Sequence, residues 1–104
     1  MEIIKTLERF EQVTNTGRNI VVFSTEWCRD CIFIKPHLPS IEANFSAWKF
    51  FFVDRDDLIE LCKDLDIYGI PSFLAFVDGE LVGRFVSKDR KTPVEIETFI
   101  RDLG

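Results

Sequence analysis

The sequence is poor in several features that mark specialised classes of protein. Its apolar runs are all far shorter than the roughly 18 residues that a membrane-spanning helix requires. Glycine and proline are scarce, with 5 and 4 of 104 residues, and there is no repeat, low-complexity tract or linker, which excludes fibrous and disordered classes. Three cysteines are too few for a disulfide-stapled scaffold. We therefore expect a globular domain outside the membrane.

Basic residues are also fewer than acidic ones: there are 13 Lys and Arg and 18 Asp and Glu, which gives a formal net charge of -5. This balance argues against nucleic acid or an anionic membrane as the main partner. The first residues, 1–6, lack the basic region and apolar stretch of a secretory signal, so we expect a cytoplasmic protein. In that compartment a close pair of cysteines is more often redox-active or metal-binding than structural.

The sequence does contain a regular alternation of helical and strand patterns over one domain, residues 1–104. The patterns predict helices at 7–16, 28–45, 58–65 and 93–103, strands at 19–25, 50–53, 73–77 and 81–86, and an edge strand within 1–5. Pro36 should bend the long helix, Asp78-Gly79 should join the last two strands, and Thr92 with Glu95 should cap the last helix. The predicted fold class is α/β, a central mixed sheet of four to five strands flanked by four helices.

Two cysteines, Cys28 and Cys31, follow a predicted buried strand and open the long helix. At a helix N-terminus the unpaired amides and the helix dipole favour negative charge, which lowers thiol pKa values from about 8.5 to roughly 3.5–7.5 in such sites. This spacing therefore predicts dithiol–disulfide exchange, with Cys28 as the attacking thiol and Cys31, one turn inside, as the resolving thiol. Trp27 precedes the pair and is expected to cover one side of the attacking sulfur.

A cysteine pair of this spacing also occurs in zinc sites and, by chance, in cores. A zinc site needs two further ligands, for which His37 and Cys62 are the only soft candidates, so we expect no metal and no bound cofactor. Cys62 lies on the apolar side of the 58–65 pattern and is predicted to be a core residue. His37 is predicted to be a surface or partly buried side chain.

The chain resembles the thioredoxin family over residues 3–103, from several motifs taken together. These motifs are Trp27-Cys28-Arg29-Asp30-Cys31, Pro36 five residues later, Val53-Asp54 at a strand end, Gly69-Ile70-Pro71-Ser72, and Phe76-Val77-Asp78-Gly79-Glu80. The resemblance implies a thioredoxin-like fold and a thiol–disulfide oxidoreductase, and the expected cytoplasmic location favours a reductase over an oxidase.

The resemblance further implies substrates, an electron donor and two binding residues. Pro71 would follow a cis peptide bond and face the cysteines, and Ile70 would offer backbone groups to an extended substrate; the alternative is an ordinary trans proline. Substrates would be protein disulfides or mixed disulfides with low-molecular-weight thiols. A thioredoxin-reductase-type donor would restore the dithiol, and the protein would act as a monomer.

The chain departs from the family pattern around the cysteines. Arg29-Asp30 replaces the usual Gly-Pro; Arg29 should favour a thiolate and Asp30 should oppose it, and their net effect stays open. Val22 and Phe50 stand where thioredoxins usually carry a buried Asp and a Lys. Glu26, Asp30 or water would then take over proton handling, with an inert exposed loop as the alternative for Glu26.

Two further segments have both a functional and a plain interpretation. The Ile32-Phe33 pair is either a docking patch or helix packing, and the basic stretch 86–91 either selects acidic substrates or forms a solvated turn. The second functional hypothesis for the whole chain is a thioredoxin-fold protein-binding module with incidental cysteines. It would keep its activity in cells after both cysteines are replaced by serine.

Overall fold

A five-stranded mixed sheet forms the centre of the structure, a computed structural model that describes residues 1–104. The strands are β1 (Glu2–Ile4), β2 (Arg18–Ser24), β3 (Lys49–Asp54), β4 (Ser72–Val77) and β5 (Glu80–Phe85). Their order is β1-β3-β2-β4-β5, with β1 and β2 parallel to β3, and with β4 antiparallel to both β2 and β5. The predicted mixed sheet is confirmed, and the N-terminal segment does form an edge strand.

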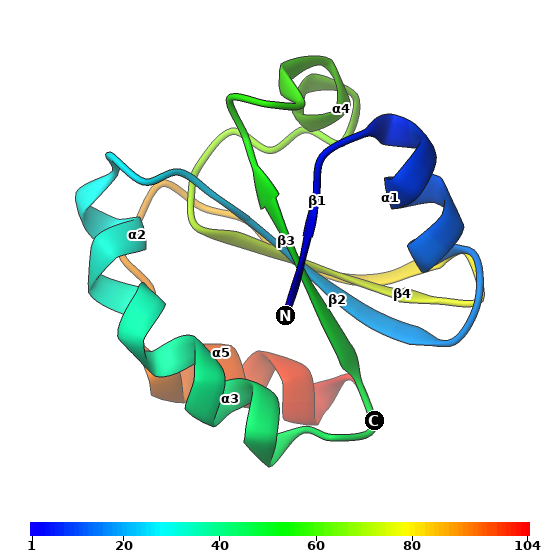
Figure 1. Cartoon of the computed structure of the whole chain (residues 1–104). Helices are drawn as coiled ribbons and strands as arrows, with labels where there is room; N and C mark the ends of the chain where they lie inside the picture. Colours follow the sequence, from blue (N-terminus) through cyan, green and yellow to red (C-terminus); the bar gives the residue numbers. More distant parts are fainter.

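Helices cover both faces of this sheet (Figure 1). The helices α1 (Leu7–Thr14) and α4 (Ile59–Asp64) lie on one face, and α2 (Arg29–Ile34), α3 (Leu38–Asn44) and α5 (Pro93–Asp102) lie on the other. Along β2, Val21 and Phe23 belong to the first apolar cluster, whereas Ile20 and Val22 belong to the second. Because successive strand residues point to opposite faces, a strand covered on both sides must be apolar throughout.

The long helix predicted from residue 28 to residue 45 is interrupted in the middle. It consists of α2, a single turn of 3-10 helix η1 (Lys35–His37), and α3. Pro36 lies in η1 and has no N–H to donate, so the regular helical hydrogen bonding stops there. The predicted bend is confirmed, and it leaves α2 as a short helix that carries the cysteine pair.

The chain reverses direction after α1 and between β4 and β5, in both places at turn residues that the sequence indicated. Helix α1 ends at Thr14, two residues earlier than predicted, and the chain turns through Gly17 at a φ of 77°. The β4–β5 turn has positive φ at both Asp78 and Gly79, as a tight hairpin requires. The Asp78 carboxylate accepts a hydrogen bond of 2.8 Å from the Gly17 amide, which ties the two reversals together.

The last helix begins with the capping box that the sequence predicted. The Thr92 hydroxyl accepts a hydrogen bond from the Glu95 amide at 3.2 Å, and the Thr92 amide donates to the Glu95 carboxylate at 3.0 Å. The Thr92 hydroxyl also donates to the Glu95 carboxylate at 2.9 Å, and the two bonds that the carboxylate accepts from the Thr92 amide and hydroxyl lower the pKa of the Glu95 carboxyl.

None of the helices combines the length and the apolar character needed to cross a bilayer.

Candidate active site

The cysteine pair lies where β2 ends and α2 begins. Cys28 is the N-cap residue of α2 and is half-buried, while Cys31 lies in the first turn and is 2% exposed. The Cys28 carbonyl accepts the first helical hydrogen bond from the Ile32 amide at 2.9 Å. One sulfur is therefore open to a partner and the other is covered, which is the difference that an attacking and a resolving thiol need.

Cys31 sits in an environment that opposes its ionisation. Burial raises the pKa of the Cys31 thiol, and the adjacent Cys28 sulfur adds to the increase. Hydrogen bonding from the Ser24 side chain and the Thr25 backbone acts in the opposite direction. Any reaction through Cys31 must therefore supply a way to remove its proton or to stabilise its charge.

The loop before β4 faces the exposed cysteine. The Ile70–Pro71 peptide bond is cis, and the Cys28 thiol donates a weak hydrogen bond to the Ile70 carbonyl across 3.8 Å. Ile70 is 8% exposed and Pro71 is buried, so backbone atoms form much of this wall. A Cβ atom on Gly69 would overlap the Ser87 carbonyl, which means that the loop between β5 and α5 packs directly against this wall.

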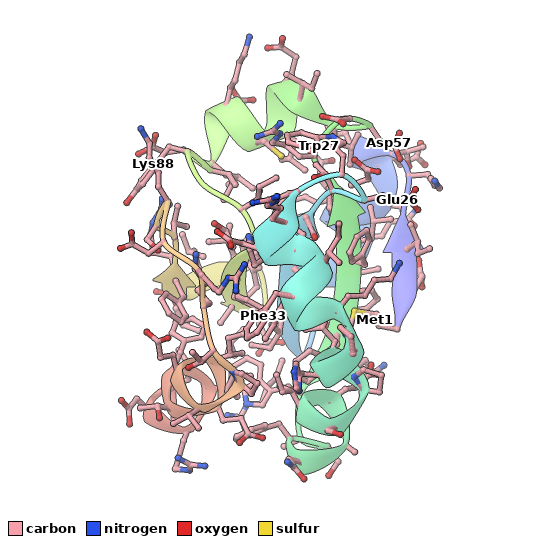
Figure 2. The ribbon with its side chains drawn as sticks, turned by 90° about the vertical axis from the view of Figure 1, so that its left-hand side faces the viewer. Met1, Glu26, Trp27, Phe33, Asp57 and Lys88 are labelled. Atoms are coloured by element: carbon pink, nitrogen blue, oxygen red, sulfur yellow. The ribbon has the colours of Figure 1, made fainter.

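Trp27 stands on the other side of Cys28 and is 62% exposed. Its indole N–H donates a hydrogen bond of 2.7 Å to the Asp56 carboxylate, and the Arg55 guanidinium lies 5.3 Å from the ring centroid. Figure 2 shows Trp27 at the end of the molecule where the β2–α2 and β3–α4 loops meet. The acidic run after β3 was not singled out from the sequence, although its charged residues follow a buried strand directly.

Known proteins share this arrangement. The family model described as Thioredoxin matches residues 2–102. The chain is 32% identical over 80 residues to "Thioredoxin H-type" of Fagopyrum esculentum, covering 76% of this chain and 69% of that protein. It is 30% identical over 95 residues to thioredoxin of Sus scrofa, covering 89% and 88%. The solved thioredoxin from Trypanosoma brucei brucei has a TM-score of 0.87 at 22% identity, covering 97% of this chain and 88% of that one.

The chain belongs to the thioredoxin family. Its sheet and helices match those of solved thioredoxins, and Cys28 and Cys31 have the spacing of the family's redox pair. These findings support thiol–disulfide oxidoreductase activity in general.

Val22 and Phe50, the two positions at which the sequence departs from the family pattern, lie in the apolar interior. Val22 is 0% exposed and Phe50 is 4% exposed, and both belong to the cluster under α3 and α5. Both side chains are apolar, so neither position supplies a carboxylate that could exchange a proton with Cys31. The departure that the sequence indicated is thus located in the core itself.

The loop between β5 and α5 differs most from what the sequence led us to expect. A solvated turn was one of its two interpretations, yet Arg90 forms an ion pair of 2.8 Å with Asp30 and Lys91 is 1% exposed. The Arg90 guanidinium also lies 4.4 Å from the Phe33 ring centroid. The solvated-turn interpretation is therefore wrong for Lys91, which is buried and hydrogen-bonded to carbonyls of its own loop, whereas Arg90 stays exposed and pairs with a residue of α2.

The remaining charged residues near the cysteines differ in their surroundings. Arg29 is exposed and makes no ion pair, whereas Asp30 is paired with Arg90 and is only partly exposed. Glu26 is exposed and lines a cavity of about 250 Å³ together with Ser24, Thr25 and Lys35. The buried Thr25 hydroxyl in that cavity has no hydrogen-bond partner.

Cys62 and His37 lie apart from the cysteine pair. Cys62 is 3% exposed in the apolar cluster under α1 and α4, as predicted, and burial raises its pKa to about 11. His37 is exposed on η1, with its ring centroid 6.0 Å from that of Phe33. The structure brings together no group of three or more His, Cys, Asp or Glu side chains that could hold a metal ion.

Proposed function

We propose that this protein reduces protein disulfides, or mixed disulfides of proteins with small thiols, by dithiol–disulfide exchange. The observation that carries the proposal is the pairing of a half-buried Cys28 at the start of α2 with a covered Cys31 one turn further along. A substrate can reach the first sulfur, and only a sulfur of the same chain can reach the second.

The reaction begins when the Cys28 thiolate bonds to one sulfur of the substrate disulfide. The other substrate sulfur leaves as a thiolate and takes up a proton. Cys31 then gives up its proton and its sulfur bonds to that of Cys28, while the bond between Cys28 and the substrate breaks. The second substrate sulfur takes up a proton, so the substrate gains two electrons and two protons and the Cys28–Cys31 dithiol becomes a disulfide.

The wall formed by Ile70 and Pro71 supports the first step. The Ile70 carbonyl lies 3.8 Å from the attacking sulfur, and Ile70 is followed by a proline that has no N–H of its own. An extended substrate backbone could add its own N–H groups to this edge, which would align the substrate disulfide with Cys28. Trp27, exposed on the other side, would cover the mixed disulfide.

The direction of electron flow and the electron donor are part of the proposal. A cytoplasmic location would keep the dithiol reduced, because that compartment maintains thiols. A thioredoxin-reductase-type protein would then return two electrons to the Cys28–Cys31 disulfide. No bound cofactor is needed, since the two sulfurs carry both electrons, and the exchange can take place on a monomer.

An equilibrium redox titration tests this proposal, with Trp27 fluorescence or thiol trapping as the signal. We expect one two-electron couple at or below about -230 mV, more reducing than glutaredoxins. A couple well above about -200 mV would instead indicate an oxidant or isomerase. The Cys28→Ser variant should lose all turnover of a protein disulfide, while Cys31→Ser should accumulate the mixed disulfide. A wild-type chain without a reversible couple would contradict the proposal.

A further inference from the structure

The burial of Lys91 has no counterpart elsewhere in this chain. Among the buried polar residues it is the only one with a formally charged side chain, and it is 1% exposed. Removing an ammonium group from water is costly unless hydrogen bonds and opposite charges compensate. Desolvation accordingly lowers the pKa of Lys91.

The ammonium group is held by its own loop. Its Nζ donates one hydrogen bond to the Ser87 carbonyl and one to the Asp89 carbonyl, each of 3.1 Å. It also lies 5.3 Å from the centroid of the Phe85 ring. A lysine ammonium has three protons, so these bonds leave one without an acceptor in the protein. Both acceptors are uncharged backbone carbonyls, so they hold the ammonium group in place but do not neutralise its charge.

The same loop is anchored on both sides of the cysteine pair. Arg90 joins it to Asp30, the residue before Cys31, through the 2.8 Å ion pair. Ser87 packs against Gly69, the residue before Ile70. Figure 2 shows the chain running from Lys88 toward α5 beside the part of α2 that carries Phe33. The loop is therefore fixed against α2 and against the Gly69–Ile70 wall, and the Ser87 carbonyl that packs on Gly69 also accepts a hydrogen bond from the Lys91 ammonium.

Several charged or titratable groups face the Lys91 ammonium. From α2 they are Asp30 and Cys31, from the loop Asp89, and from α5 Glu95, and each favours the charged ammonium. An interaction between two charges is reciprocal, so a positive charge held beside this part of α2 would favour a thiolate at Cys31. Arg90 already neutralises Asp30, so the cation is not fully taken up by that carboxylate.

We propose that Lys91 is a positioning residue whose buried positive charge stabilises the Cys31 thiolate in the resolving step. The proposal rests on the proposed function above, because it concerns the second of its two exchanges. In that step the Cys31 proton leaves, its sulfur bonds to Cys28, and the substrate sulfur departs with a proton. Lys91 exchanges no proton and forms no bond; it makes the loss of the Cys31 proton less costly in a site without a buried carboxylate.

Reaction with dithiobis-nitrobenzoate, an aromatic disulfide that releases a coloured thiolate, separates the two steps. The first equivalent of colour reports attack by Cys28, and the second reports resolution by Cys31. Lys91→Met should slow the second release roughly tenfold and move its pH profile upward by about one unit, since one pKa unit changes the thiolate fraction tenfold. The first release should change less than twofold.

Matched variants separate charge from structure. Lys91→Gln keeps a donor for the loop carbonyls but no charge, and should behave like Lys91→Met, whereas Lys91→Arg should restore the second release. Lys88→Met removes an exposed lysine from the same loop and should leave both releases unchanged. Cys62 contributes little colour at neutral pH, because its pKa is about 11.

Two results would overturn the inference. One is a second release that Lys91→Gln and Lys91→Met leave unchanged; the other is equal slowing of both releases in every variant, which indicates only a loosened loop. If the wild-type chain releases no second equivalent, the proposed function itself fails, whatever Lys91 does. Far-UV circular dichroism of each variant checks that the fold is retained.

Discussion

The two flanks of the cysteine pair are built from the same three kinds of residue. On one flank the Trp27 ring contacts Arg55 and hydrogen-bonds Asp56, and those two charges lie 3.7 Å apart. On the other, Phe33 lies under Arg90, which pairs with Asp30 at 2.8 Å. Each side of the cysteine pair thus carries an aromatic ring, an arginine and an aspartate in contact with one another.

What lies behind each flank is different. Behind the Trp27 flank, Cys62 lines a cavity of about 370 Å³ together with Arg55 and Ile59, and burial favours its neutral thiol. Behind the Phe33 flank lies Lys91, for which backbone carbonyls and nearby carboxylates retain the charge against the effect of burial. Similar surface contacts thus cover a neutral thiol on one flank and a charged ammonium on the other.

The largest expected effect comes from breaking the packing of the Lys91 flank. In Gly69→Ala the new Cβ atom would overlap the Ser87 backbone, which has no flexible end to move aside. Overpacking of this kind costs about 1–3 kcal/mol, measured as the free energy of unfolding in denaturant. Redox turnover should fall as well. Gly17→Ala, strained by a φ of 77° but placed at the opposite end of β2 from the cysteines, should lose stability and keep its turnover.

Because the Cys62 thiol is buried, we expect the folded protein to lose stability at high pH. Its pKa rises from 9.0 to about 11 on folding, so the neutral thiol favours the folded state below pH 9.0. That contribution declines as the pH rises from 9.0 to about 11, because the thiolate prefers the unfolded chain. Thermal unfolding at stepped pH measures it. The slope in this range should be shallower in Cys62→Ala, and an identical slope would contradict the prediction.

A third comparison uses two N-cap threonines. The Thr92 and Thr6 hydroxyls accept hydrogen bonds from the Glu95 and Arg9 amides, at 3.2 and 3.1 Å respectively. Replacing either by alanine should cost about 1 kcal/mol of stability. Only Thr92→Ala should also slow the second release of coloured thiolate, because Thr92 follows Lys91 directly. Equal kinetics in the two variants would mean that the cap does not help to place Lys91.

The smallest expected effect compares the two aspartates of the flanks. Asp30→Asn removes a negative charge next to Cys31 and frees Arg90, so alkylation of the cysteine pair by iodoacetamide at neutral pH should accelerate about threefold. Asp56→Asn keeps an oxygen that can accept the Trp27 indole N–H, so its rate should stay within about 1.5-fold of wild type. If the two variants respond equally, the flanks do not differ electrostatically.

The elements of the fold could be predicted because their signals are local. Apolar runs marked β2, β3 and β4, the Asp78-Gly79 pair marked the hairpin, and the Thr92 capping box marked α5. Errors were confined to element ends and to the interior of the long helix, where Pro36 ends one helix and η1 separates it from the next. Short-range chemistry determines such features, so a single sequence is sufficient.

The Lys91 flank could not be predicted from the chain in the same way. Asp30 and Arg90 are 60 residues apart, and nothing in the local pattern around either residue indicates the other. A basic stretch between a strand and a helix is usually a solvated turn; here residues 88–90 are exposed as expected, but Lys91 is buried, and Ser87 packs on Gly69. The sequence did single out this stretch by its three basic residues within an acidic chain, but it did not indicate which of them is buried.

By itself, the sequence determined the α/β elements, the site of the cysteine pair at a strand-to-helix junction, and the absence of the family's buried Asp. Periodicity and turn chemistry act over a few residues, and they leave little freedom at those points. Tertiary structure alone decided which charges surround the cysteines. The burial of Lys91 and the ion pair between Asp30 and Arg90 arise only when α2 and the loop before α5 meet, because both depend on contacts between distant segments.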